Sequence, residues 1–241
     1  PDPVRRDSQL QRRRRRHARA GAAAGRLVSG EPLAYAISDL DPGDEEAIRQ
    51  AAELLVEGFR EDWPDAWPDL DAALQEVREC LGEGGICRAA VAEGGAILGW
   101  IGARPSYGEN VWELHPLVVR PDAQRRGIGH ALVADLEERV GERGGYTLWL
   151  GTDEETNMTT LSGVDLYPDV LGRLAKIRNL RGHPYEFYQR LGYAIVGVMP
   201  DANGPGKPDI YMAKRLQATG IRGCSADSTR LGEPSQRNEP H

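Results

Sequence analysis

Apolar positions along the chain follow two spacings, which predicts an α/β protein. Short apolar runs are typical of buried strands, and apolar residues three or four positions apart are typical of helices that cover a sheet. The runs predict strands at 35–40, 86–93, 96–103, 112–119, 146–150, 193–199 and 210–212. The helical spacing predicts helices at about 41–59, 70–81, 129–142, 170–177 and 183–191.

The stretch 112–129 organises this pattern, because it passes from a strand through a turn into a helix. Leu117, Val118 and Val119 form the apolar run of the strand, and Gln124-Arg125-Arg126-Gly127-Ile128-Gly129 leads into the helix. Glycines allow close approach of backbone to a ligand, and the free N–H groups of a first helical turn attract anions. The turn is therefore a candidate pyrophosphate site. The alternatives are an ordinary tight turn and solvated arginines.

The same strand carries two polar residues that can do acid–base chemistry. Glu113 and His115 are two positions apart and therefore share a face. Pro116 has no N–H for a central ladder, so the strand should bulge or splay beside the turn. The strand at 146–150 follows a helical crossover, so it should lie parallel to 112–119. The alternative is a solvent-facing polar pair without chemistry.

Charge is distributed unevenly along the chain. Residues 1–30 hold nine arginines and two acids, a net charge of +7, and residues 216–241 hold three of each, a net charge of zero. Because the whole chain has a net charge of −7, residues 31–215 have a net charge of −14. An acidic body favours a cationic small molecule and disfavours nucleic acid. We expect one folded domain at 33–216, a disordered Arg-rich tail at 1–32 and a disordered polar tail at 217–241. A nucleic-acid arm or a transit peptide is the alternative for residues 1–30.

Several classes of protein are disfavoured by what the sequence lacks. It has no apolar run of ~18 residues, so no membrane span is expected. We see no hydrophobic signal region at the start, and the three cysteines, Cys80, Cys87 and Cys224, lack metal-ligand spacing. These features predict a cytoplasmic protein with reduced thiols and no metal.

The turn at 124–129 resembles the (Gln/Arg)-x-x-Gly-x-(Gly/Ala) signature of the GCN5-related N-acetyltransferases (GNAT), matched at Gln124, Gly127 and Gly129. Residues 33–216 further resemble the aminoglycoside 6'-N-acetyltransferases, in particular the chromosomally encoded enterococcal type. The resemblance rests on Trp-Glu-Leu-His-Pro-Leu-Val-Val at 112–119, Leu-Gly-Thr-Asp at 150–153, His-Pro-Tyr-Glu-Phe-Tyr at 183–188 and Lys-Pro-Asp-Ile at 207–210.

The resemblance implies a GNAT fold: a mixed, mostly antiparallel sheet with a parallel central strand pair and helices on both faces. It implies acetyl-CoA as cosubstrate, an aminoglycoside as substrate and a homodimer. Glu113, His115 and Tyr188 would be catalytic, with Tyr188 next to the thioester sulfur. Leu117, Val118 and Val119, with the turn Gln124, Arg125, Arg126, Gly127, Ile128 and Gly129, would bind the coenzyme. Trp63, Tyr107 and Asp153, with Glu113, would bind the antibiotic.

Three other functions are open. The protein could acetylate another amine, such as a polyamine or a protein N-terminus. It could also be a coenzyme A-binding protein that has lost catalysis, or a nucleic-acid binder through its arginines. Glu113, His115 and Tyr188 argue against lost catalysis, and the acidic body argues against nucleic acid.

Overall fold

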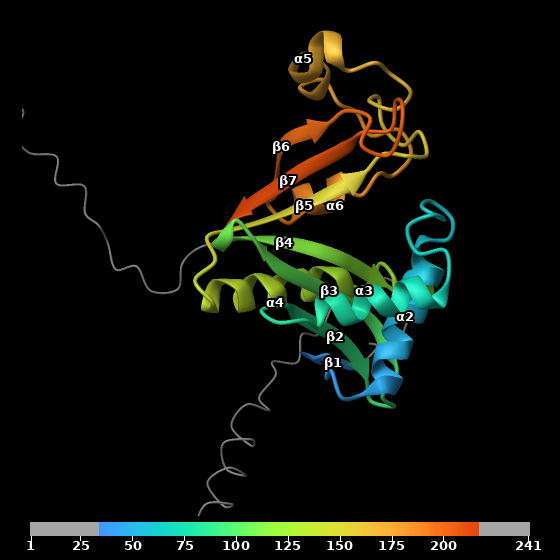
Figure 1. Ribbon diagram of the computed structural model, residues 1–241, viewed down its shortest axis with the longest axis vertical. Coiled ribbons are helices and arrows are strands. Elements are labelled where there is room, and N and C mark those ends of the chain that lie inside the picture. Colours follow the sequence, from blue (N-terminus) through green and yellow to red (C-terminus); the bar gives the residue numbers. More distant parts are fainter. Residues whose placement is uncertain (1–33, 217–241) are drawn as a thin grey trace, which may run out of the picture.

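The computed structural model describes residues 34–216, which form one seven-stranded sheet with helices packed on it (Figure 1). The strand order is β1-β2-β3-β4-β5-β7-β6, and the pair β4–β5 is parallel while the other neighbours are antiparallel. The strands are β1 (Tyr35–Asp39), β2 (Ile86–Ala92), β3 (Ile97–Ser106), β4 (Gly108–Val119), β5 (Thr147–Asp153), β6 (Ala194–Met199) and β7 (Asp209–Arg215). The expected mixed sheet with a parallel central pair is confirmed.

Helices cover both faces of the sheet, as expected. The helices are α2 (Glu45–Phe59), α3 (Leu70–Cys80), α4 (Ile128–Glu142), α5 (Val170–Leu174) and α6 (Tyr185–Arg190), with short 3-10 turns at Pro121–Ala123 and Tyr167–Asp169. Residues of α2 and α3 share one buried cluster with Trp100, and residues of α4 and α6 share the other with Leu148. Two cores therefore sandwich the sheet, as its two apolar faces require.

Aspartates cap the starts of α2 and α3. Asp44 and Asp69 each accept a hydrogen bond from the backbone N–H three residues on, which satisfies one of the free donors of the first turn. These caps fix where the two helices begin, and the cap at Asp69 thereby marks the end of the α2–α3 loop.

Strand bounds differ from the sequence pattern at the β3–β4 hairpin. The sequence predicted strands ending at 103 and starting at 112, whereas β3 runs to Ser106 and β4 starts at Gly108, with Tyr107 at the tip. β5 likewise runs on to Asp153 rather than ending at Leu150. Cross-strand hydrogen bonds extend each strand beyond its apolar run, and polar residues signal no strand by themselves.

The bulge expected at Pro116 is present in β4. Ile101 pairs with Leu117 but Ala103 pairs with Leu114, so one residue of β3 faces two of β4 there. The bulge moves every later side chain of β4 to the other face. Leu114 belongs to the α4-side core, whereas Val118 belongs to the α2-side core.

The parallel ladder between β4 and β5 is short. Val111, Trp112 and Glu113 pair with Thr147, Leu148 and Trp149, and the ladder ends there. Figure 1 shows the two strands diverging beyond this point, towards the end of the molecule where the α2–α3 loop lies. The expected splay is therefore confirmed, and it separates the carboxyl ends of two central strands.

The predictions for the two tails fall on residues 1–32 and 217–241, which lie outside the described residues. Among residues 34–216, no helix has the length and apolar character needed to cross a membrane.

Candidate active site

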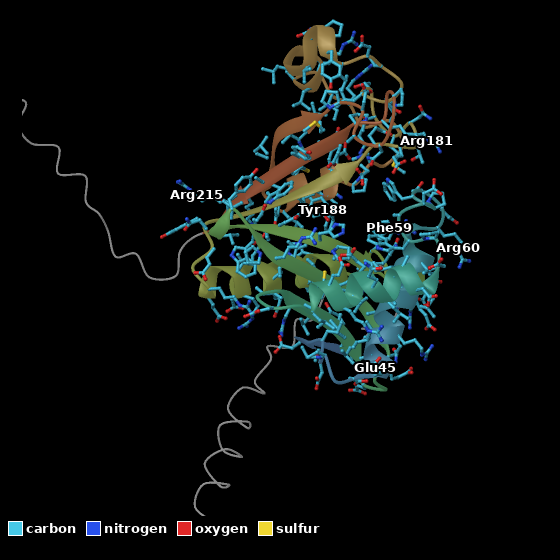
Figure 2. All side chains as sticks on the ribbon, in the orientation of Figure 1. Glu45, Phe59, Arg60, Arg181, Tyr188 and Arg215 are labelled. Atoms are coloured by element: carbon cyan, nitrogen blue, oxygen red, sulfur yellow. The ribbon has the colours of Figure 1, made fainter. Side chains whose placement is uncertain are left out.

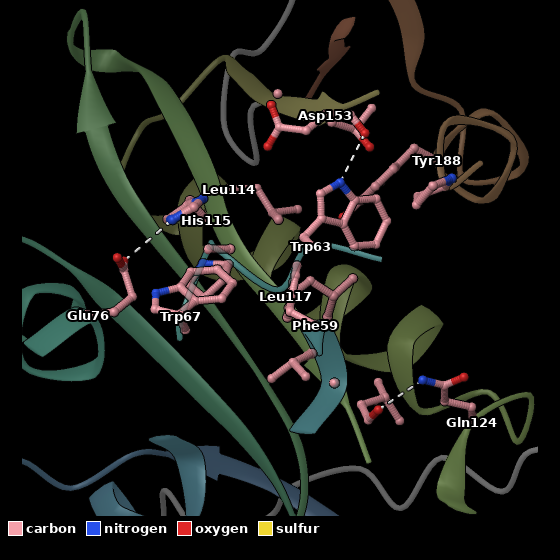
Figure 3. A pocket seen from close by; sticks show the side chains of 18 residues that line it. Phe59, Trp63, Trp67, Glu76, Leu114, His115, Leu117, Gln124, Asp153 and Tyr188 are labelled. Carbon is pink, nitrogen blue, oxygen red and sulfur yellow. Dashed lines mark hydrogen bonds and ion pairs between the residues drawn. The ribbon is translucent and has the colours of Figure 1, made fainter. Parts of the chain in front are cut away.

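A cavity of about 490 Å³ lies where β4 and β5 diverge. Its walls come from both faces of the sheet, so it passes through the gap between the strands. Figure 3 shows these side chains, and Figure 2 labels Tyr188 near the gap between β4 and β5. The lining residues are Gly58, Phe59, Trp63, Ala66, Trp67, Glu76, Leu114, His115, Pro116, Leu117, Val118, Val119, Gln124, Gly151, Thr152, Asp153, Pro184 and Tyr188.

The α2–α3 loop forms an aromatic wall of the cavity. Phe59 packs against Trp63 and Trp67, with ring centroids 5.8 and 4.6 Å apart. Trp63 Nε1 donates to the backbone oxygen of Asp153, at 3.3 Å. The loop is thus tied to the end of β5, and Trp63 and Asp153 lie together in the cavity wall.

His115 and Glu76 form the polar wall on the α3 side. His115 Nε2 lies 3.5 Å from Glu76 Oε1, and the Trp67 ring lies 5.9 Å from the imidazole ring (Figure 3). The contact with His115 lowers the pKa of Glu76 despite the opposing effect of burial. Glu76 is therefore a carboxylate at neutral pH.

Glu113 shares the face of His115 but is not among the lining residues. Its Oε2 accepts from Arg104 Nε at 3.3 Å, and the two residues face one another across the β3–β4 ladder. The predicted common face of Glu113 and His115 is confirmed. The ion pair with Arg104 holds the Glu113 carboxylate beside the cavity.

Tyr188 lines the cavity from α6, on the opposite side of the gap. Its ring packs edge-on against Phe187 and Tyr193. Burial raises the pKa of Tyr188, so the phenol stays protonated at neutral pH. Within residues 34–216 no hydrogen-bond partner is found for its hydroxyl, which can therefore serve as a proton donor to a ligand.

A second acidic group lies at the end of β5. Asp209 of β7 stands opposite Asp153 in the β5–β7 ladder, and burial, followed by the charge of Asp153, raises the pKa of Asp209 to about 7. Its Oδ1 is buried without a hydrogen-bond partner among the described residues. Asp153 lines the cavity, whereas Asp209 stands next to it in the ladder, outside the lining.

His183 supports the same strand end and stays neutral. Burial lowers its pKa, and its Nδ1 accepts from the backbone N–H of Tyr185 at 3.2 Å. The proton therefore lies on Nε2, which donates to the carbonyl of Asp153 at 3.1 Å. His183 thus holds the backbone of Asp153 in place.

The glycine-containing turn has the geometry of an anion site. Gly127 is the N-cap of α4 with φ +85°, and α4 has no side-chain cap. The N–H groups of the first turn are thus open to a ligand. Arg125 and Arg126 are exposed, whereas Ile128 is buried and can offer only its backbone. Of this turn, Gln124 lines the cavity.

The structure brings most of the expected site residues to one cavity. These are Trp63, His115, Leu117, Val118, Val119, Gln124, Asp153 and Tyr188. Glu113 and the turn at 125–129 lie outside the lining, and Tyr107 is an exposed residue at the β3–β4 tip. The sequence interpretation missed Glu76, Trp67 and Asp209. Among residues 34–216, no group of three or more acidic, histidine or cysteine side chains is placed to hold a metal.

Comparisons with known proteins agree with this geometry. The sequence model of the acetyltransferase (GNAT) family matches residues 48–167. A crystal structure of an aminoglycoside 6'-N-acetyltransferase complexed with coenzyme A is 45% identical, with a TM-score of 0.68, and covers 75% of this chain and 97% of that one. The enzyme from Enterococcus faecium is also 45% identical over the same shares, with a TM-score of 0.66. An aminoglycoside 6'-acetyltransferase type Ii is 38% identical over the same shares, with a TM-score of 0.56. No curated protein sequence matched the chain.

Proposed function

Since the chain belongs to the acetyltransferase (GNAT) family, we propose that it transfers the acetyl group of acetyl-CoA to the 6'-amine of aminoglycosides. In this proposal it is a cytoplasmic enzyme of antibiotic resistance. The observation that carries the substrate class is the acidic rim of the cavity. Glu76 and Asp153 line it and Glu113 and Asp209 stand beside it, which suits a polycationic antibiotic.

The residues around the β4–β5 gap fit acetyl-CoA. The open N–H groups at the start of α4 suit the pyrophosphate, since the helix dipole favours an anion there. The backbone of Leu117 to Val119, where β4 has left β5, suits the pantetheine arm. The thioester would then lie between His115 and Tyr188, on opposite sides of the gap.

The catalytic roles follow from these positions. A protonated amine cannot attack a thioester, so a nearby base must take its proton. Glu113 and His115 are the bases on the acidic side, and Tyr188 is the acid for the leaving thiolate. Trp63, Asp153 and Tyr107 would contact the antibiotic, with Tyr107 reaching it from the β3–β4 tip.

We also propose that the enzyme is a homodimer. Apolar side chains are exposed on the sheet's edge strand β6, on α5 and on the 3-10 turn before it, among them Val196, Met199, Leu171 and Tyr167. A second copy would cover this surface. Light scattering of the wild type and of Val196→Glu tests the assembly, and a monomeric wild type would contradict it.

One experiment tests the function. Thiol release from acetyl-CoA is measured with kanamycin, gentamicin, spermidine and a peptide with a free N-terminus, and the product is located by NMR. We expect rapid release with the aminoglycosides and acetylation at the 6' position. Preference for spermidine or the peptide would assign another amine, and no release with any acceptor would indicate a coenzyme-binding protein without catalysis.

A further inference from the structure

Glu76 is placed to control His115 from outside the reacting strand. It lies on the inner side of α3, its side chain is 17% exposed, and its Oε1 is 3.5 Å from Nε2 of His115 (Figure 3). One turn later, the Cys80 thiol lies 3.7 Å from the same oxygen and 3.3 Å from the carbonyl oxygen of His115. The Cys80 thiol therefore links the Glu76 carboxylate to the backbone of His115.

Arg104 and Glu113 are the charged residues of β3 and β4 near the pair of Glu76 and His115. Arg104 of β3 adds positive charge near Glu76, but its guanidinium is paired with Glu113 of β4. From α3, Glu76 faces the imidazole, and the Cys80 thiol contacts Glu76 and the backbone oxygen of His115. On its other side the ring faces Trp67, which carries no charge.

A carboxylate only accepts hydrogen bonds, so it favours a proton on the imidazole nitrogen that faces it. We propose that Glu76 is a positioning residue that holds the proton of neutral His115 on Nε2 and leaves Nδ1 as the proton acceptor for the substrate amine. The 3.5 Å separation is long, as such contacts often are before a ligand binds.

This inference rests on the proposed acetyl transfer and assigns its proton route. The ammonium gives one proton to Nδ1, and the nitrogen lone pair then forms the C–N bond at the thioester carbon. The C–S bond breaks, and its electron pair leaves on sulfur. The nitrogen loses its second proton to water, the Tyr188 hydroxyl protonates the thiolate, and water reprotonates Tyr188. One proton is released overall, from Nδ1 to water.

The test combines kinetics with the nitrogen spectrum of the ring. Glu76→Gln keeps the shape of the side chain but can donate as well as accept. Glu79→Gln is the matched control, because Glu79 is an exposed residue of the same helix that contacts Gln75. Glu76→Asp is the conservative variant, and each full-length protein is checked by circular dichroism.

We expect kcat for kanamycin to fall at least tenfold in Glu76→Gln, with the KM for acetyl-CoA within twofold and partial recovery in Glu76→Asp. The ¹⁵N shifts of His115 should show the Nε2–H form in the wild type and in Glu79→Gln, and a mixture of forms in Glu76→Gln. An Nδ1–H form in the wild type overturns the proposal without any variant. An unchanged kcat, or an unchanged ring spectrum, in a folded Glu76→Gln also overturns it. The ring spectrum requires no turnover, so it tests the role of Glu76 independently of activity. Failure of the proposed function would instead appear as a wild type that is inactive with every amine.

Discussion

The indole of Trp63 donates to the backbone oxygen of Asp153, at 3.3 Å, although the two residues are 90 positions apart. The bond connects the α2–α3 loop to the end of β5 across the cavity. His183 donates to the same oxygen from the other side. One carbonyl group therefore sets the position of a loop that would cover the antibiotic.

Replacing Trp63 by Phe removes this bond and keeps an aromatic side chain. A neutral hydrogen bond contributes about 0.5–1.5 kcal/mol, so we expect the KM for kanamycin to rise about 2- to 10-fold, with the KM for acetyl-CoA unchanged. Steady-state kinetics measures both. Trp67→Phe, which has no described hydrogen bond to lose, should have a smaller effect. Equal effects of the two changes would mean that only aromatic packing matters.

Replacing Gly127 by Val should weaken acetyl-CoA binding about tenfold. The φ of +85° disfavours any side chain, and a branched one would stand where the pyrophosphate is proposed to bind. Gly144→Val is the matched control, since Gly144 has the same φ at the other end of α4. Both variants should lose similar thermal stability, but calorimetric titration should show weaker binding for Gly127→Val alone. Equal affinities would remove the phosphate assignment.

Replacing Glu113 by Gln should lower kcat/KM for aminoglycosides about 10- to 1,000-fold, because the side chain loses its charge and basicity. Acetyl-CoA affinity should not change. Glu109→Gln on the same strand is the control, since Glu109 is exposed. Activity equal to the wild type with every amine would assign Glu113 to the ion pair with Arg104 alone, and lost acetyl-CoA binding would make its role structural.

Asp209 makes stability depend on pH in an unusual direction. Its pKa is raised to about 7, so the folded protein favours the protonated acid, whereas the unfolded chain ionises near the ordinary value of 3.8. The resulting stability is fully present below pH 3.8 and is lost as pH rises through about 7. Partial exposure and solvent screening reduce the effect to roughly 1–3 kcal/mol.

Asp209→Asn is neutral at every pH and has nearly the same shape. Relative to the wild type, it should gain unfolding free energy as pH rises from 4.5 to 8. Urea denaturation at several pH values measures the difference. A constant difference between the two proteins would contradict the raised pKa.

The sequence predicted those parts of the fold that depend on local pattern. The apolar run at Leu117 to Val119, the missing N–H of Pro116 and the glycine at 127 each correspond to a local structure, namely strand, bulge and N-cap. Glu76 could not be found this way. It is one of several charged residues in an amphipathic helix, and its meeting with His115 arises from the packing of α3 on the sheet. Asp209 was missed for a similar reason, since its burial depends on the β5–β7 register.

The extra residue at the bulge of β4 makes this strand far more sensitive to deletions than to substitutions. Leu114 and Val118 serve opposite cores because of it. Deleting one codon near Pro116 would move the side chains of Leu117, Val118 and Val119 to the opposite faces of the sheet, although all other amino acids would be retained. Point substitutions at these positions alter single contacts, whereas a deletion exchanges two whole surfaces. Natural variants of this strand should therefore differ by substitution and keep its length.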